Sequence, residues 1–546
     1  MFSGKISLYY NTLKNVKPTQ LYHQVYYRAK NRFINKSYTA TQQQGIQLKL
    51  QRGIICPKSF LGQNSFSFLN LEKQFSKIDW NYSEYGKLWT YNLNYFEFLN
   101  QEGMKKQENL RLIRDYISFA DALQDGLEPY PISLRGINWI KFLAENKIQD
   151  EEINTFLYRD YLRLYDSLEY HLLANHLLEN GFSLLFGSYY FKDDRLYHKA
   201  RKILKKELEE QVLKDGAHYE LSPMYHQIIL HRILDSIYLV QHNSWKDREL
   251  LSLLKGKAEV MLGWLNEISF SNGDIPKLND AAKGIAPGTN ELIGYAKRLG
   301  LASRKVKLSD SGYRKFSNHD FEIIADVGQI APYYQPGHSH ADSLQFVFNY
   351  KNRPIIVDTG ISTYEKNERR QLERSTAAHN TVTINDLNSS NVWGGFRVAE
   401  RAKVSIIKET ENGIEASHNG YRKFGVIHKR SFGFTSGEFR IEDRIEGKAN
   451  KIIAEGHLHF HPDVQPEVIE NRIIINDILE LQISGATEMH LKEYQLAVGF
   501  NKLQPAKKII YRIQDRAEIV IRPLVLDTIS TPASTVVEIT RTDASC

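Results

Sequence analysis

The chain of 546 residues contains only two cysteines, Cys56 and Cys546. A disulfide framework is therefore excluded, and the fold must be held together by its core. Long hydrophobic runs are missing too, so no stretch approaches the length of a membrane span. The first residues have no sustained apolar core followed by a small-residue cleavage site, the pattern of a signal peptide. We therefore expect a cytoplasmic protein, or a periplasmic one if the chain is processed or exported by another route.

The chain also lacks the marks of a nucleic-acid or nucleotide-binding protein. No glycine-rich phosphate-binding motif precedes a helix, and basic residues sit among acidic ones, as in Lys202–Glu210. The 71 Lys and Arg against 64 Asp and Glu give a net charge of +7, a mild excess that suits an acidic ligand. With 42% hydrophobic residues the chain is globular, and its length requires more than one domain. The oligomeric state stays open.

The periodicity of apolar residues divides the chain into three parts. Residues 1–84 mix basic, aromatic and polar segments, which predicts a partly helical N-terminal extension. Residues 85–308 have helical spacing, and residues 309–546 have short runs of period two, such as Phe439–Ile445. The sequence therefore predicts packed helix pairs followed by an antiparallel β-sandwich. Breaks at Gly126, Gly181 and Gly216 are expected to separate helices.

A histidine cluster lies just inside the β-rich part. His338 and His340 alternate at the predicted start of a β-strand, so their side chains are expected to point in different directions. Asp358 follows at a turn, and His379 precedes another β-rich run. His340, Asp358 and His379 make a plausible ligand set for a divalent ion such as zinc, which leaves His338 free for a substrate.

The helical part supplies complementary groups. Asn175 and His176 interrupt a leucine-rich helix face, and Tyr225 follows Pro223, which predicts the first turn of a helix. Amide, phenol and imidazole groups are those needed for β-elimination on a uronic acid. An amide assisted by an imidazole can stabilise the charge that develops beside the carboxylate, and a tyrosine can act as base if the site lowers its pKa.

The order of these motifs resembles that of the heparinase II/III-like polysaccharide lyases, over roughly residues 85 to 540. The motifs that carry the resemblance are Asn175-His176, Ser222-Pro-Met-Tyr-His226, Gly337-His-Ser-His-Ala-Asp342, Val357-Asp-Thr-Gly360 and His379-Asn-Thr381. It implies an α/α toroid, an incomplete barrel, followed by an antiparallel β-sandwich. It also implies a carbon–oxygen lyase acting on a heparin- or heparan-sulfate-like acidic polysaccharide.

The resemblance also assigns roles to residues. Asn175 is expected to neutralise the substrate carboxylate, Tyr225 to act as general base and acid, and His338 to serve as a further acid/base group. His340, Asp358 and His379 are expected around a structural metal, and His379 at either the metal or the substrate. The candidate substrate-binding residues are Arg135, Trp139, His176, Glu220, His226, Arg374 and Asn380.

Two other functions remain open at this stage. A glycoside hydrolase on a similar helical toroid would need two carboxylates across a cleft, for which Glu220 and Asp280 are candidates. A non-catalytic polysaccharide-binding factor in cell-surface polysaccharide biosynthesis would have retained the fold alone. The presence of Asn175, Tyr225 and His338 together favours a lyase over such a factor.

Overall fold

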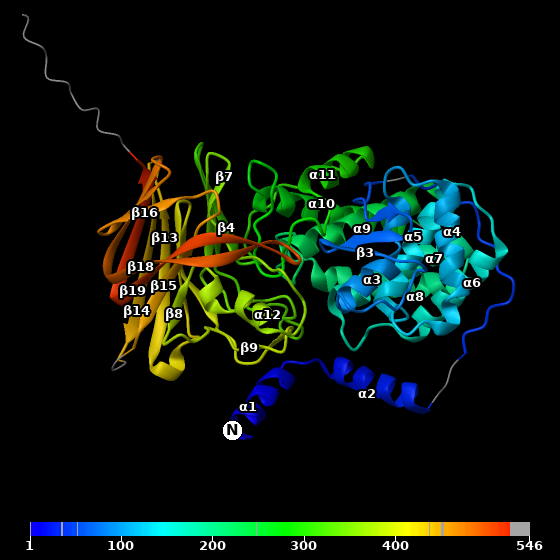
Figure 1. Ribbon diagram of the computed structural model, residues 1–546, viewed down its shortest axis with the longest axis horizontal. Coiled ribbons are helices and arrows are strands. Elements are labelled where there is room, and N and C mark those ends of the chain that lie inside the picture. Colours follow the sequence, from blue (N-terminus) through cyan, green and yellow to red (C-terminus); the bar gives the residue numbers. More distant parts are fainter. Residues whose placement is uncertain are drawn as a thin grey trace, which may run out of the picture.

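The computed structural model describes residues 2–33, 37–51, 53–246, 248–435, 437–448 and 452–524. A helical body and a β-rich body lie side by side along the long axis of the molecule (Figure 1). The last helix of the helical body, α11, ends at Arg298, and the first strand of the β-rich body, β4, begins at Tyr313. Among the described residues, the hydropathy of every helix is too low, or its length too short, for it to cross a bilayer.

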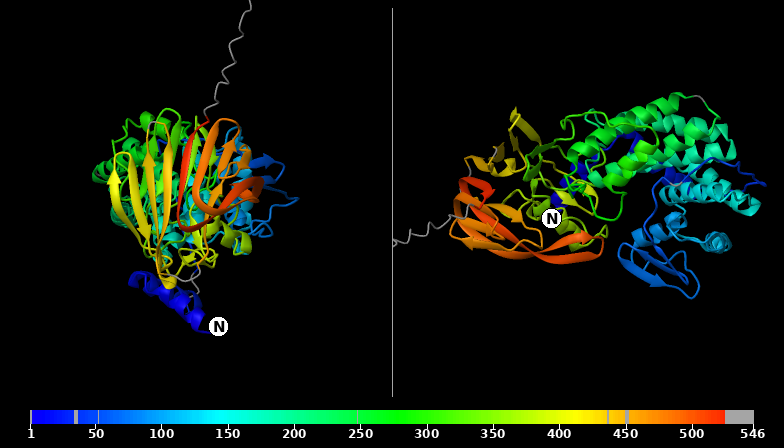
Figure 2. Two further views of the ribbon diagram at one scale, coloured as in Figure 1. Left: turned by 90° about the vertical axis from the view of Figure 1, so that its left-hand side faces the viewer. Right: turned by 90° about the horizontal axis from the view of Figure 1, so that it is seen from above.

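The N-terminal part contains both helix and strand. Helices α1 (Phe2–Leu13) and α2 (Pro18–Phe33) lie outside the two bodies, along one side of the molecule (Figures 1 and 2). Strands β1 (Phe60–Gly62), β2 (Ser65–Phe68) and β3 (Leu71–Gln74) form a three-stranded antiparallel sheet. Phe66 of this sheet packs edge-on against Trp80, which attaches the sheet to the core of the helical body.

The helical body is built around α7. Its helices are α3 (Lys87–Tyr95), α4 (Lys106–Ser118), α5 (Pro129–Glu145), α6 (Glu151–Asp166), α7 (Ala174–Phe191), α8 (Asp194–Gln211), α9 (Pro223–His242), α10 (Glu249–Ile268) and α11 (Thr289–Arg298). Neighbours in sequence pack together, α5 on α6, α7 on α8 and α9 on α10, while α5 and α9 both pack on α7. This arrangement buries α7 almost completely.

Helix starts follow the polar residues that can satisfy free backbone N–H groups. The Asp150 carboxylate accepts from the backbone N–H of Ile153 at the start of α6, and the Ser222 hydroxyl accepts from that of Tyr225. Pro223 is the first residue of α9, as predicted, so Tyr225 lies in its first turn.

The expectation that Gly181 separates two helices is wrong. Gly181 lies in the middle of α7, where an added Cβ would come 2.8 Å from Ile203 Cγ2 of α8. The residue is small because α7 and α8 approach closely there, and close packing leaves the same mark in a sequence as a helix break.

The β-rich body consists of two main antiparallel sheets. The four-stranded sheet contains β4 (Tyr313–Ser317), β5 (Phe321–Asp326), β6 (Phe346–Tyr350) and β7 (Arg353–Ile356). The ten-stranded sheet contains β8 (Val382–Ile384), β11 (Val404–Thr410), β12 (Gly413–His418), β13 (Val426–Phe434), β14 (Phe439–Gly447), β15 (Ala454–His459), β16 (Pro466–Ile469), β17 (Arg472–Ile475), β18 (Leu479–Gly499) and β19 (Lys502–Pro523). A short pair, β9 (Val392–Trp393) and β10 (Arg397–Val398), and helix α12 (Glu368–Glu373) lie in the connections.

The two sheets share one core. Ile323 and Phe346 of the smaller sheet belong to the same buried cluster as Ile441 and Ile519 of the larger one. Burial alternates along β14, as its period-two sequence predicts. The predicted fold class, an incomplete α/α toroid followed by an antiparallel β-sandwich, is confirmed.

Buried imidazoles of the helical body predict a loss of stability in acid. Burial lowers the pKa of His218 to about 4, and the pKa values of His226 and His231 to about 3. Below about pH 6.5 the unfolded chain therefore binds protons that the folded chain does not bind until its own pKa is reached. We expect the free energy of unfolding to fall as the pH drops toward about 4, by up to about 3 kcal/mol per histidine.

Chemical denaturation across this pH range measures the slope. His226→Gln keeps a hydrogen-bonding side chain that cannot be protonated, so it should flatten the pH dependence even if it lowers stability overall. His319→Gln is the control, because the His319 side chain is 99% exposed. An unchanged slope in His226→Gln contradicts the assignment.

Candidate functional site

Segments from both bodies meet where the helical body faces the β-rich body. The start of α7 carries Asn175, the first turn of α9 carries Tyr225, and the connection between β5 and β6 carries His338. The rings of Tyr225 and His338 are stacked, with their centroids 3.9 Å apart. Tyr225 and His338, two of the catalytic candidates that the sequence predicts, are therefore in direct contact.

The backbone beside these segments is strained. Leu173, Leu221 and Leu344 have φ angles of 61°, 54° and 64°, in the left-handed region that side chains rarely adopt. Each costs of the order of 1–2 kcal/mol, and such residues cluster where a site needs an exact backbone position. Leu173 immediately precedes α7, and Leu221 immediately precedes Ser222, the capping residue of α9.

Glu220 joins Asn175 to His338. The Asn175 side-chain amide lies 3.0 Å from both carboxylate oxygens of Glu220, and the Asn175 backbone N–H donates to the same group at 2.9 Å. Oε2 of the Glu220 carboxylate lies 3.3 Å from His338 Nε2. Glu220 and Asn175 are both buried, so these contacts fix the orientation of the amide.

Asp280 holds the two histidines of the loop. Its Oδ2 lies 2.9 Å from His338 Nδ1 and its Oδ1 lies 2.9 Å from His340 Nε2. Arg370 of α12 donates to both oxygens, at 2.5 and 2.7 Å. Burial alone would raise the pKa of Asp280, but the Arg370 charge and the two imidazoles hold it well below its ordinary value.

The predicted strand at His338 and His340 is wrong, because the strand β6 begins only at Phe346. The expectation that the two side chains point in different directions is also wrong. Both imidazoles turn toward the one buried carboxylate of Asp280. Their hydrogen bonds to this buried charge stabilise the loop more than the regular conformation of a strand would.

Tyr225 lies beside a second tyrosine. Its hydroxyl is 3.3 Å from that of Tyr364, whose ring has the Arg370 guanidinium carbon 5.0 Å from its centroid. Burial raises the pKa of Tyr225 well above its ordinary value, and Tyr364 and the carboxylates of Asp280 and Glu220 add to this effect. The folded site therefore holds Tyr225 protonated, whereas a base role requires the proton to leave first.

His176 stands at the edge of the group. Its Nδ1 lies 3.0 Å from Glu169 Oε1, and its ring lies 4.8 Å from that of Tyr130. Burial would lower the pKa of His176, but the Glu169 carboxylate outweighs burial and raises it. Tyr225, His176, His338 and Tyr364 are only partly buried, so they are the most exposed members of the group.

The predicted metal ligands His340, Asp358 and His379 lie close to one another. The rings of His340 and His379 are 5.2 Å apart, and His379 Nδ1 lies 2.7 Å from Asp358 Oδ2. His340 Nδ1 and His379 Nε2 are buried without a hydrogen-bond partner, and such nitrogens are the donors that zinc takes. Within the described ranges, however, no three His, Cys, Asp or Glu side chains are arranged to hold a metal ion. The donor types suit zinc, and metal binding stays a prediction.

Arg135 and Trp139 lie inside the helical body. The Arg135 guanidinium is fully buried and donates to the Asp160 carboxylate at 2.7 and 3.0 Å. Trp139 is fully buried and packs edge-on against Phe96. These surroundings give both residues a structural role, and the structure does not bring them to the group around Tyr225.

The remaining substrate-binding candidates are buried and hold backbone in place. His226 Nε2 lies 3.0 Å from the Met261 carbonyl, and Arg374 donates to the carbonyl of Ser339, between the two loop histidines. Asn380 donates to the carbonyls of Phe346 and Val357. Direct contact of these residues with a substrate stays a prediction.

Sequence reasoning missed Tyr364 and Arg370, and it considered Asp280 only as a hydrolase carboxylate. Arg370 lies in the strongly charged stretch 365–374, which is typical of a solvated helix, and yet its side chain is buried. Tyr364 follows the Asp358-Thr-Gly360 turn by four residues, and this proximity is the only signal that could have singled it out.

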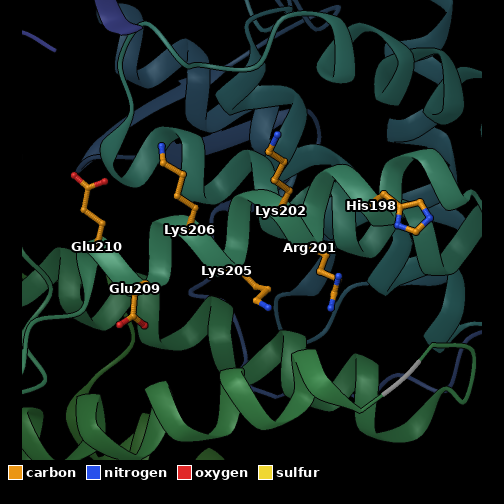
Figure 3. A pocket seen from close by; sticks show the side chains of 7 residues that line it. All are labelled: His198, Arg201, Lys202, Lys205, Lys206, Glu209 and Glu210. Carbon is orange, nitrogen blue, oxygen red and sulfur yellow. The ribbon is translucent and has the colours of Figure 1, made fainter. Parts of the chain in front are cut away.

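A hollow of about 710 Å³ on the outer surface is lined entirely by side chains of α8 (Figure 3). Its lining residues are His198, Arg201, Lys202, Lys205, Lys206, Glu209 and Glu210. Lys205 binds Glu249 of α10 at 2.7 Å, and Arg201 binds the same carboxylate. This surface is the solvated helix face that its mixed charges predict, and it takes no part in the group around Tyr225.

Comparison with known proteins gives concordant matches. A sequence model described as heparinase II/III N-terminus matches residues 132–295, and one described as heparinase II/III-like, C-terminal, matches residues 302–527. A heparin-sulfate lyase of Pedobacter heparinus is 24% identical over 381 residues, which are 62% of this chain and 55% of that protein. One of Bacteroides stercoris is 23% identical over 322 residues, 53% of this chain and 46% of that protein. The chain thus spans about half the length of the curated relatives it matches.

A solved structure has the same fold. The crystal structure of heparinase III superposes with a TM-score of 0.66 at 16% identity, covering 93% of this chain and 92% of that one. At this identity the likeness establishes the fold alone.

The contacts of Asp280 predict that Asp280→Asn is strongly destabilising. The substitution keeps the shape of the side chain but leaves the buried Arg370 charge without its partner, which costs about 3–5 kcal/mol. Equilibrium unfolding in urea measures the change. Asp310→Asn, at an exposed position, is the control. Adding Arg370→Met to Asp280→Asn should recover part of the loss, and a double variant less stable than Asp280→Asn contradicts the pairing.

Proposed function

Because the chain belongs to the heparinase II/III-like family, we propose that it is a polysaccharide lyase that cleaves a uronic-acid-containing acidic polysaccharide by β-elimination. The observation that carries the proposal is the group formed by Asn175, Tyr225 and His338. Tyr225 stacks on His338, and Glu220 contacts both Asn175 and His338. The names of the curated relatives favour a heparin- or heparan-sulfate-like substrate.

The reaction needs a base, an acid and a neutralised carboxylate. A base removes the proton from C5 of the uronate, the electron pair forms the C4–C5 double bond, and the C4–O4 bond breaks as O4 takes a proton. The carboxylate on C5 opposes the first step, because its negative charge disfavours further negative charge on the neighbouring carbon. Hydrogen-bond donors aimed at this carboxylate therefore lower the barrier.

Asn175 is suited to the carboxylate. Its amide nitrogen has two N–H groups, and one shared contact with Glu220 leaves the other for the substrate. Since Glu220 fixes the amide beforehand, little reorganisation is needed when the substrate binds. The partly exposed His176, with its pKa raised beside Glu169, supplies a second donor at the edge of the site.

Tyr225 is suited to both proton transfers. Its raised pKa favours the protonated phenol, which can donate a proton to O4. Before it can take the C5 proton it must lose its own, and the Tyr364 hydroxyl at 3.3 Å offers a route for that proton. Burial and the Asp280 carboxylate raise the pKa of Tyr364 well above its ordinary value, and the Arg370 charge beside its ring partly opposes this rise. A single group that does both steps acts on one face of the sugar ring. His338, held by Asp280, would serve the epimer whose C5 proton lies on the other face.

The contacts of the candidate carboxylates do not favour a glycoside hydrolase. Glu220 and Asp280 are both fully buried, and each binds donors of the protein with both of its oxygens. Neither is therefore free to activate a water or to protonate a glycosidic oxygen.

We further propose a structural zinc ion at His340, Asp358 and His379. The unpartnered nitrogens of the two imidazoles support this assignment, and the ion would stabilise the loop that carries His338. It would supply no step of the elimination.

Tyr225→Phe is expected to abolish product formation while binding and folding persist, because it removes one hydroxyl and little packing. Ultraviolet absorbance of the unsaturated uronate measures the reaction, with heparan sulfate, heparin, alginate and other polyuronates as substrates. Tyr158→Phe is the matched control, since it removes a hydroxyl bonded to Asp193 at the start of α8. Full activity of Tyr225→Phe rules out its role. Binding to these polymers without absorbance from the unmodified chain indicates a binding function instead.

Metal analysis tests the zinc proposal separately. We expect about one zinc per chain, and His340→Ala should lower both the metal content and the unfolding temperature. His319→Ala, at an exposed position, should change neither. Metal content that does not respond to His340→Ala excludes this ligand set.

A further inference from the structure

Helix α2 turns polar side chains toward the protein. In α2, the Gln20 amide and the Tyr27 hydroxyl donate to the carbonyls of Leu172 and Leu168, and Lys30 binds Asp166. The buried positions of α2 thus carry polar groups that bond backbone and carboxylate oxygens of the helical body. A helix that stabilises a core by apolar burial would have the reverse arrangement.

Several apolar or aromatic side chains of the two helices are more than half exposed. We call the set Ile6, Tyr10, Leu13, Tyr22, Val25 and Phe33 the N-terminal face. Their exposed fractions are 66%, 67%, 52%, 64%, 68% and 79%. Ile6, Tyr10 and Leu13 are spaced by four and three residues, so they form one stripe along α1. Figure 1 and the left view of Figure 2 show the helices at one side of the molecule, outside its two bodies. Gathered apolar side chains of this exposure mark an interaction surface.

The charged side chains of the two helices that carry the N-terminal face all have one sign. All 64 acidic residues of the chain lie beyond Leu71, whereas ten of the 71 basic residues lie before it. Lys17 and Lys30 pair with Glu210 and Asp166 of the helical body. Lys5, Lys14, Arg28 and Arg32 are exposed on the same two helices as the apolar side chains.

This combination selects among three kinds of partner. An acidic polysaccharide would bind the Lys and Arg side chains, but its hydroxyl and sulfate groups would gain little from contact with aliphatic side chains such as Ile6, Leu13 and Val25. A second copy of the chain would bring equal positive charge against positive charge. A lipid surface with anionic headgroups satisfies both features, since apolar side chains enter the headgroup boundary while Lys and Arg contact phosphates.

We propose that the N-terminal face binds the surface of a membrane that contains anionic lipids, with α1 and α2 lying in its plane. The helices rest on the bilayer and do not cross it. Their inward polar contacts keep the two bodies attached above that surface.

Flotation of the full chain with lipid vesicles tests the proposal. We expect binding to phosphatidylcholine vesicles that contain phosphatidylglycerol and no binding to phosphatidylcholine alone. Replacing Ile6, Tyr10 and Leu13 together by Ser should weaken binding at least about tenfold, because apolar contact area is lost. Replacing Lys5 by Gln should weaken vesicle binding by up to about fivefold, and added salt should weaken it too.

The control is Ile406→Ser with Ile407→Ser, which removes two exposed apolar side chains from β11. It should leave vesicle binding unchanged. Circular dichroism of each variant checks that the fold is kept.

Three results would overturn the proposal: no binding to either vesicle, equal binding to both, or full binding by the triple serine variant. Without vesicle binding, heparan sulfate affinity that falls in the triple variant assigns the face to polysaccharide. A concentration-dependent dimer that the same variant abolishes assigns it to a second copy. None of these readouts depends on lyase activity.

Discussion

The arrangement of the whole site depends on one buried carboxylate, that of Asp280. It lies in the helical body, and it receives two imidazoles and a guanidinium from the β-rich body. A buried charge is tolerated only when it is fully compensated. The positions of the three donors are therefore fixed by the position of the carboxylate. The orientation of His338, the loop that carries His340 and the position of α12 are therefore consequences of a single electrostatic requirement.

The order of the two bodies could be predicted because the spacing of apolar residues changes from helical to period two along the chain. The period-two pattern of β14 and the proline at the start of α9 each report on their own segment, and each prediction is confirmed. Asn175 could be found because it interrupts an apolar helix pattern, Tyr225 because it follows a helix start, and His338 because histidines cluster in its segment. Periodicity carries no information on which segments meet, so the connection of Glu220 with both Asn175 and His338 could not be predicted.

Other side chains could not be interpreted because burial and chemistry are independent. Arg135 and Arg370 are both buried arginines in helices of the structure. Arg135 pairs with Asp160 within the helical body, while Arg370 pairs with a carboxylate of the site. The difference lies in the partner, which is 25 residues away in one case and 90 in the other. Only the folded chain reveals it.

The N-terminal helices touch both bodies. Thr12 of α1 accepts a hydrogen bond from Trp393 in the β-rich body, while Tyr27 of α2 donates to the backbone of the helical body. Whatever holds these two helices in a fixed relation also restricts the angle between the bodies, and hence the approach of Asp280 to its partners. By thermodynamic reciprocity, a ligand of these helices that favours one angle between the bodies would be bound more tightly when a second ligand favours the same angle.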